Sequence, residues 1–137
     1  MTNDSRREQA GILLRKARED DHPSRTLAGD SQASAWIIGF HCQQAVEKCI
    51  KAVLAAHGVR YPFTHDIEAL VKLARNNGLV FPPNTDDLPR LTPFAALARY
   101  DDEDDTDATT FKGITADWLL TCSAQALRWA EQQLGNV

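Results

Sequence analysis

The stretch that decides the fold is residues 33–57, which read ASAWIIGFHCQQAVEKCIKAVLAAH. Apolar residues recur along it every three or four positions, which is the period of a helix that buries one face. We therefore expect a helix over Ala33–His57, with Asp30 or Ser31 as its N-cap and Gly58 as its stop. Because the apolar stripe is wide, this helix should be the most enclosed one in the fold. The stripe and its margins consist of Trp36, Ile38, Phe40, Cys42, Ala45, Cys49, Ile50, Val53 and Ala56.

The rest of the chain also has the helical period, and no long segment alternates apolar and polar residues as a strand would. Pro23 should either kink the first helix or divide it, with a stop near Glu19. We therefore expect an all-α fold, an antiparallel up-and-down helical bundle of four long helices plus a short extra helix. Beside the helix already described, the expected segments are a helix over Asp4–Gly29, a helix that Thr64 caps and that ends at residues 76–78, a loop or helical turn over Phe81–Pro93, a short helix over Thr92–Tyr100 and a helix over Thr115–Leu134.

The length and composition fit a single domain over residues 1–137. The chain has 43% hydrophobic and 25% charged residues and a net charge of −4, so bulk charge does not favour nonspecific binding to nucleic acid. We see neither a run of about 20 apolar residues, which a membrane helix needs, nor an apolar secretion signal. The chain has no CxxC pair, and we expect its cysteines to be reduced and buried. These features predict a cytoplasmic protein that does not enter a membrane.

Four polar residues of the central helix also follow its period and share one flank, namely His41, Gln44, Lys48 and Lys51. An imidazole, an amide and two ammonium groups suit phosphate oxygens and the edge of a base. The pattern therefore predicts a nucleotide or phosphate site on this flank. The alternative is a solvated helix face, on which Glu47 pairs with Lys51 four positions later.

The segment from Phe40 to Ala52 resembles the signature of the HEPN domain family, which reads roughly F-H-x-x-Q-A-x-E-K-x-x-K-A. His57-Gly58, Thr64-His65-Asp66-Ile67 and Ala98-Arg99-Tyr100 follow in the order in which the family has similar motifs. The resemblance implies an antiparallel helical bundle that usually forms a homodimer. Relatives are often encoded beside a minimal nucleotidyltransferase, so it also implies a nucleotide- or RNA-associated module that works with such a partner, in a toxin–antitoxin-like or nucleotide-handling system.

Some members of the family are ribonucleases that use an arginine and a histidine with four to six residues between them. The arginine holds the scissile phosphate through two hydrogen bonds, and the histidine moves the proton of the 2′-hydroxyl group. Arg60 and His65 have this spacing, which implies a metal-independent endoribonuclease as the alternative function. Arg15 and His22 have it too, however, and Arg60 is followed by a turn. A structural position in the first turn of a helix is therefore the competing interpretation of His65.

The sequence indicates neither a metal site nor a cofactor site. The acidic run over residues 101–105 must be solvated, but it does not begin a calcium-binding loop. Such a loop needs a glycine at its sixth position and a glutamate at its twelfth, where this chain has Thr106 and Lys112. We also find no glycine-rich phosphate loop and no zinc-hydrolase motif. We therefore expect no metal and no cofactor.

Overall fold

The computed structural model describes residues 2–82, 85–99 and 113–135. These residues contain no strand, and the expected all-α bundle is confirmed. The elements are α1 (Asn3–Ala28), α2 (Ala35–Ala56), α3 (Ile67–Asn76), the 3-10 segment η1 (Thr85–Arg99) and α5 (Ala116–Leu134).

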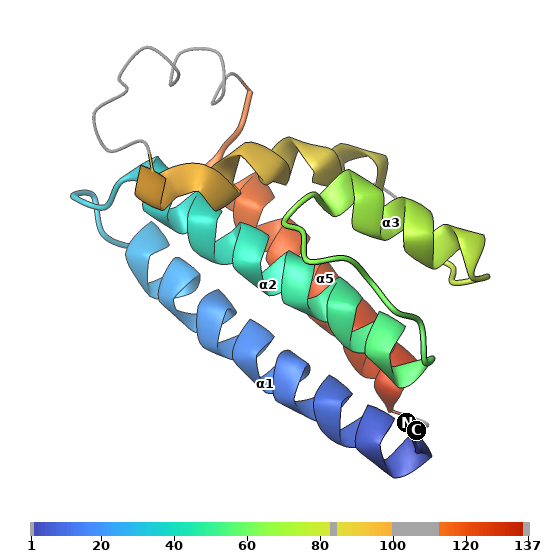
Figure 1. The fold of residues 1–137 in the computed structure, drawn as a ribbon. Helices are drawn as coiled ribbons and strands as arrows, with labels where there is room; N and C mark the ends of the chain where they lie inside the picture. Colours follow the sequence, from blue (N-terminus) through green and yellow to red (C-terminus); the bar gives the residue numbers. More distant parts are fainter. Residues whose placement is uncertain (1, 83–84, 100–112, 136–137) are drawn as a thin grey trace.

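The three long helices α1, α2 and α5 form the body of the bundle, and α3 and η1 cover a further side of α2 (Figure 1). A short connection joins α1 to α2, and the start of α1 and the end of α5 lie at one end of the bundle (Figure 1). Hence α1 is antiparallel to both α2 and α5. The central position belongs to α2, which contacts each of the other four elements.

The expectation that α2 is the most enclosed helix is confirmed. Most of its residues are buried, whereas only four residues of α1 are. Cys42, Cys49 and Cys122 are buried free thiols, also as expected. None of the helices among the described residues is long and apolar enough to cross a membrane.

The start of α2 differs from the expectation. Its N-cap is Ser34, whose side chain accepts a hydrogen bond from the amide of Trp36, so the helix begins at Ala35 rather than Ala33. Asp30 instead holds a separate turn before the helix, because its side chain accepts from the amide of Gln32. Several polar residues in this segment are suitable caps, and the sequence pattern alone does not choose between them.

The start of α3 also differs. Its N-cap is Asp66, whose side chain accepts from the amide of Ala69 at 3.3 Å, and the expected cap Thr64 lies just before it. Thr64 accepts from the amide of Asp66 at 3.0 Å and so shapes the approach to the helix. Thr64 and Asp66 are both residue types that commonly cap helices, so the sequence pattern alone does not decide between them.

The division of the first helix near Glu19 is wrong, because α1 continues through Pro23. Proline has no amide hydrogen, so the helix loses one backbone hydrogen bond there. Local side-chain bonds support this turn: the hydroxyl of Ser24 donates to the carbonyl of Asp21 at 2.6 Å, and Arg25 pairs with the carboxylate of Asp21 at 2.8 Å. Ser24 is fully buried, so packing also holds the helix together at this point.

The proline-rich stretch is more regular than expected. The 3-10 segment η1 begins at Thr85, inside the stretch expected to be a loop or a helical turn, and continues into the expected short helix. The fully buried residues Leu91 and Phe94 attach this segment to α2. Gly39 makes the close approach possible, because a Cβ atom there would lie 2.2 Å from the ring of Phe94. Tyr100 and the acidic run over 101–105 lie outside the described residues.

Candidate functional site

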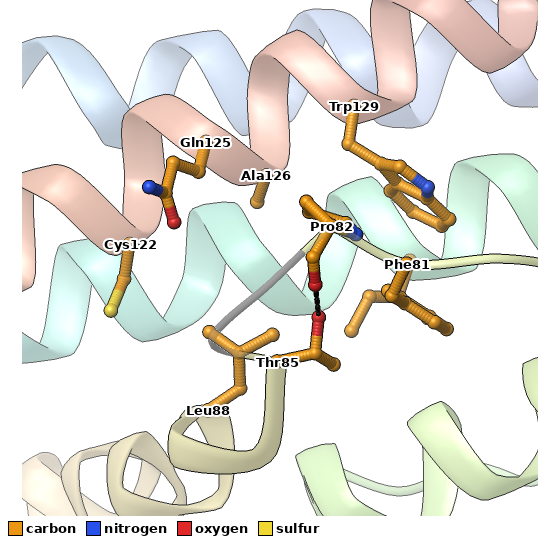
Figure 2. A pocket seen from close by; sticks show the side chains of 9 residues that line it. Phe81, Pro82, Thr85, Leu88, Cys122, Gln125, Ala126 and Trp129 are labelled. Atoms are coloured by element: carbon orange, nitrogen blue, oxygen red, sulfur yellow. Dashed lines mark hydrogen bonds between the residues drawn. The ribbon is translucent and has the colours of Figure 1, made fainter.

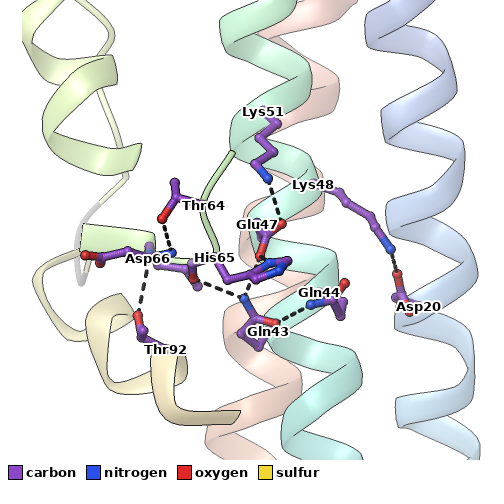
Figure 3. A network of polar contacts seen from close by, with 11 residues as sticks. Asp20, Gln43, Gln44, Glu47, Lys48, Lys51, Thr64, His65, Asp66 and Thr92 are labelled. Carbon is purple, nitrogen blue, oxygen red and sulfur yellow. Dashed lines mark hydrogen bonds and ion pairs between the residues drawn. The ribbon is translucent and has the colours of Figure 1, made fainter. Parts of the chain in front are cut away.

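A buried carboxylate, that of Glu47, organises the polar residues in the middle of α2 (Figure 3). Glu47 is only 3% exposed, and its oxygens accept hydrogen bonds from Gln43 Nε2, Lys51 Nζ and His65 Nδ1, each at 2.9 Å. Gln43, Glu47 and Lys51 are spaced by four residues, so they share one face of the helix. We call these three residues together with His65 the Glu47 cluster.

The charge state of Glu47 follows from these contacts. Burial by itself raises the pKa of a carboxyl group, but hydrogen bonds from Lys51, His65 and Gln43 outweigh burial and hold the pKa of Glu47 below its ordinary value. Glu47 is therefore ionised at neutral pH, and an ionised carboxylate only accepts hydrogen bonds. Hence Nδ1 of His65 carries the hydrogen in their shared bond.

The Glu47 cluster fixes the segment that leads into α3. His65 belongs to this segment, and its carbonyl lies 3.5 Å from Nε2 of Gln43. The next turn is tied to η1, because the amide of Ile67 donates to the hydroxyl of Thr92 at 3.3 Å. The side chain of His65 is 48% exposed, and its ring packs edge-on against Phe63. The ring is therefore oriented by a carboxylate on one side and open to solvent on the other.

A second carboxylate, that of Asp20 on α1, holds two other residues of the α2 flank. Nδ1 of His41 lies 3.2 Å from Oδ1 of Asp20. Lys48 donates to Oδ2 of the same carboxylate (Figure 3). The side chains of His41 and Lys48 are about a quarter exposed, at 27% and 24%. We call these three residues the Asp20 cluster, which lies at the edge between α1 and α2.

The predicted phosphate flank is thus divided between two clusters. His41 and Lys48 belong to the Asp20 cluster, while Lys51 belongs to the Glu47 cluster and also lies over the ring of Tyr61, 5.6 Å from its centre. Gln44 lies between the two and donates to Oε1 of Gln43 at 2.6 Å. Both lysines therefore already have a carboxylate partner, and the flank is not a single open cationic face.

Within one chain, Arg60 and His65 lie apart. Arg60 lines an open groove at the end of α2, beside Ala55 and Arg6, whereas His65 contacts Glu47 in the middle of that helix. Ala55 and Glu47 are about 12 Å apart along the helix, at 1.5 Å per residue. Arg60 and Arg6 line the same groove, and His65 is not among the residues that line it.

A small cavity lies between α2, α5 and the start of η1 (Figure 2). Its volume is about 20 Å³, which is space for about one water molecule. Phe81 stacks on Trp129 at its edge, with ring centres 4.4 Å apart, and the indole nitrogen of Trp129 donates to the carbonyl of Val80 at 2.8 Å. These contacts attach the segment after α3 to α5, and the cavity is too small for a nucleotide.

The cysteines are poor nucleophiles in this environment. Burial raises the pKa of Cys42 to about 11 and that of Cys122 to about 12, and it raises the pKa of Cys49 as well. All three thiols therefore stay protonated at neutral pH. In the described part of the chain, no group of three or more histidine, cysteine, aspartate or glutamate side chains is arranged to hold a metal ion.

The sequence interpretation missed the two carboxylates at the centres of these clusters. Glu47 had a usable signal, because Gln43 and Lys51 stand four residues before and after it on the most apolar helix. From the spacing alone, Glu47 is expected to pair with Lys51 on a solvated face of the helix. Asp20 had no such signal, because its partner Lys48 lies on another helix and 28 residues away in the sequence.

The helical-bundle fold agrees with the comparison to known families. The sequence model of the HEPN domain matches residues 10–132, a region that includes all of α2 and both clusters. Comparison with curated proteins and with solved structures gives no match. The family match covers most of the chain, so the resemblance in the α2 signature is confirmed. The chain belongs to the HEPN domain family.

Proposed function

We propose that this HEPN-domain protein is a cytoplasmic, dimeric module that associates with nucleotide or RNA and works with a minimal nucleotidyltransferase. The observation that carries the proposal is the Glu47 cluster. Two residues of the family signature, Glu47 and Lys51, are occupied together with Gln43 and His65 in holding α2 and the segment before α3 together. The separation of Arg60 from His65 within one chain further favours a binding module over a self-contained enzyme.

The partner is tested by co-expressing the chain with a minimal nucleotidyltransferase encoded beside it. The proposal predicts that the two proteins co-elute in size-exclusion chromatography at micromolar concentration. Separate elution under the same conditions would contradict the partner assignment. A matched sample without the nucleotidyltransferase shows where the HEPN protein elutes by itself.

Exposed apolar side chains support the dimer. Among the described residues, Phe63 and Val80 are 98% and 77% exposed, and Ile12 and Ile37 are also exposed. An interface between two copies would remove some of this surface from water. Sedimentation should give about twice the chain mass of 15.2 kDa, and a single species at the mass of one chain would contradict the dimer.

The α2 flank is a candidate contact for phosphate at its exposed edge, where His41 and Lys48 lie. A phosphate there competes with Asp20 for both side chains. Lys48→Ala should therefore weaken the binding of a nucleotide about tenfold or more, whereas Asp20→Asn should strengthen it. Lys72, which is 71% exposed on α3, provides the control. Equal effects of Lys48→Ala and Lys72→Ala would mean that the nucleotide is held only by nonspecific electrostatic attraction, and would contradict a phosphate site at Lys48.

One observation favours the alternative function, a metal-independent endoribonuclease. Glu47 orients the half-exposed ring of His65 and places the hydrogen on Nδ1, which leaves Nε2 as a proton acceptor. Nε2 would take the proton of an RNA 2′-hydroxyl, whose oxygen attacks the phosphorus. The bond from phosphorus to the 5′-oxygen breaks, and this oxygen takes a proton from water. Arg60 would have to come from a second copy of the chain.

The ribonuclease alternative is tested with purified protein and RNA in the presence of EDTA. It predicts cleavage that His65→Asn and Arg60→Gln abolish. The matched control is His22→Asn, because His22 belongs to the other arginine–histidine pair and is exposed on α1. Absence of cleavage by the unmodified protein, or equal cleavage by the His65→Asn variant, would contradict this function.

A further inference from the structure

A groove of about 690 Å³ lies where the start of α1 meets the turn after α2. Arg6 comes from the first turns of α1, and Arg60 and Tyr61 come from the turn, so residues far apart in sequence line one surface. Gln9 of α1 and Tyr61 also line it, from its two sides. We call this surface the arginine groove. Its volume lies within the range of pockets that hold small ligands.

The arginine groove is cationic and has no internal counter-charge. None of the described residues that line it is acidic, and neither Arg6 nor Arg60 forms an ion pair with a described residue. This differs from the α2 flank, where Lys48 and Lys51 each have a carboxylate partner. In a chain with a net charge of −4, two arginines without an acidic partner in one groove form a local site for an anion.

Gly58 leaves room for the side chain of Arg6. Gly58 has φ of +71°, a conformation that other residues rarely adopt, and a Cβ atom there would lie 2.7 Å from Cζ of Arg6. Glycine thus allows the guanidinium to pack directly on the turn. Nε of Arg6 is buried and has no hydrogen-bond partner among the described residues. A buried donor without an acceptor is unfavourable, so an anion in the groove that Arg6 shifted to meet would supply the missing acceptor.

We infer that the arginine groove binds a phosphate group, carried by a nucleotide or by RNA, and that Arg6 and Arg60 are its ligands. The guanidinium fork matches two oxygens of a phosphate group, which a single ammonium does not. Gln9 and Tyr61 add polar groups beside the two arginines. This inference rests on the proposed association with nucleotide or RNA, but it uses other residues than the α2 flank and pairs Arg60 with Arg6 instead of His65.

The test is isothermal titration of the full chain with pyrophosphate, with AMP and with a short single-stranded RNA. Arg6→Gln and Arg60→Gln should each weaken binding by about tenfold. Arg7→Gln should weaken it less than about twofold, because Arg7 is exposed and does not line the groove, although it removes the same charge. Pyrophosphate or AMP binding as tightly as RNA would identify a free nucleotide phosphate, and tighter RNA binding would identify the RNA backbone.

Two results would overturn the inference. One is no binding of any of the three probes by the unmodified protein at about 1 mM, and the other is an equal loss in all three variants. Thermal melting shows whether Arg6→Gln still folds. If it does not, Arg60→Gln still decides the test, because Arg60 is exposed and its replacement should leave the fold intact. Co-elution with the nucleotidyltransferase is measured on the same variants, so failure of the groove and failure of the proposed function are separate results.

Discussion

The Glu47 and Asp20 clusters both join a carboxylate to basic side chains of α2, but they lie at different depths. The side chain of Glu47 is 4% exposed and that of Asp20 is 16% exposed. Glu47 also joins three side chains from two segments, whereas Asp20 joins two from one helix. The comparison indicates that the deeper carboxylate, Glu47, holds the segment before α3 against α2. The shallower one, Asp20, lies at an edge where a ligand can compete with it for His41 and Lys48.

A third pair extends the comparison to the surface. Glu68 and Lys72 on α3 lie 3.1 Å apart, and their side chains are 56% and 71% exposed. The energetic value of an ion pair depends on what removing one partner leaves behind. The three carboxylates should therefore rank by burial, with Glu47 first, Asp20 second and Glu68 last.

The largest effect is expected at Glu47. Glu47→Gln keeps the shape of the side chain but leaves the ammonium of Lys51 buried without a counter-charge. Breaking a buried pair in this way costs on the order of 3 kcal/mol of unfolding free energy. Urea unfolding followed by circular dichroism measures this change. A loss below about 1 kcal/mol would place Glu47 with the surface pairs and would contradict the comparison.

The pH dependence of stability should also show the Glu47 cluster. The folded-state pKa of Glu47 is lower than its unfolded value, which is about 4.3 for glutamate. Its contribution to stability is therefore present above the unfolded pKa and is lost as the pH falls through the lower folded pKa. Urea midpoints measured from neutral to acidic pH should fall below about pH 5 in the unmodified protein. Glu47→Gln should make this fall in the urea midpoint with decreasing pH less steep. An equally steep fall in the variant would contradict the lowered pKa of Glu47 as its cause.

The intermediate effect is expected at Asp20. Asp20→Asn removes the charge that holds His41 and Lys48, but these side chains are about a quarter exposed and water can replace the lost contact. We expect a loss of about 1 kcal/mol in unfolding free energy, again measured with urea. If this variant loses as much stability as Glu47→Gln, depth is not what distinguishes the two clusters.

The smallest effect is expected at Glu68. Glu68→Gln breaks a pair that is exposed on both sides, one turn apart on α3. Such pairs contribute about 0.2–0.5 kcal/mol, and salt screens them. Thermal or urea unfolding at low and high ionic strength should show a small difference that salt removes. A salt-independent loss of more than about 1 kcal/mol would show that Glu68 has a further role.

The sequence predicted the bundle because the apolar period of α2 is long and uninterrupted. The same period puts the polar residues of α2 on one flank, but it does not show how contacts with other segments divide that flank. The spacing of His41, Lys48 and Lys51 puts them on neighbouring faces of one helix, but it does not tell which residues of other segments approach them. Asp20 and His65 approach from different sides, and these contacts decide that the flank is divided.

Spacing in the sequence was also a poor guide to the neighbours of Arg60. The segment from Arg60 to His65 runs back along α2, so five positions of chain span about 12 Å of helix. The residue that shares the groove with Arg60 is Arg6, which lies in the first turns of α1. No local pattern connects the two arginines, because the antiparallel packing of α1 and α2 brings them together.

The central claim is that Glu47 holds the segment of His65 against α2, and a double-mutant cycle tests it most directly. The variants are Glu47→Ala, His65→Ala and the combination of both, and the measured quantity is the free energy of unfolding in urea. We predict a coupling of about 1 kcal/mol, because each variant removes the same hydrogen bond. Losses that add to within about 0.3 kcal/mol would contradict the claim.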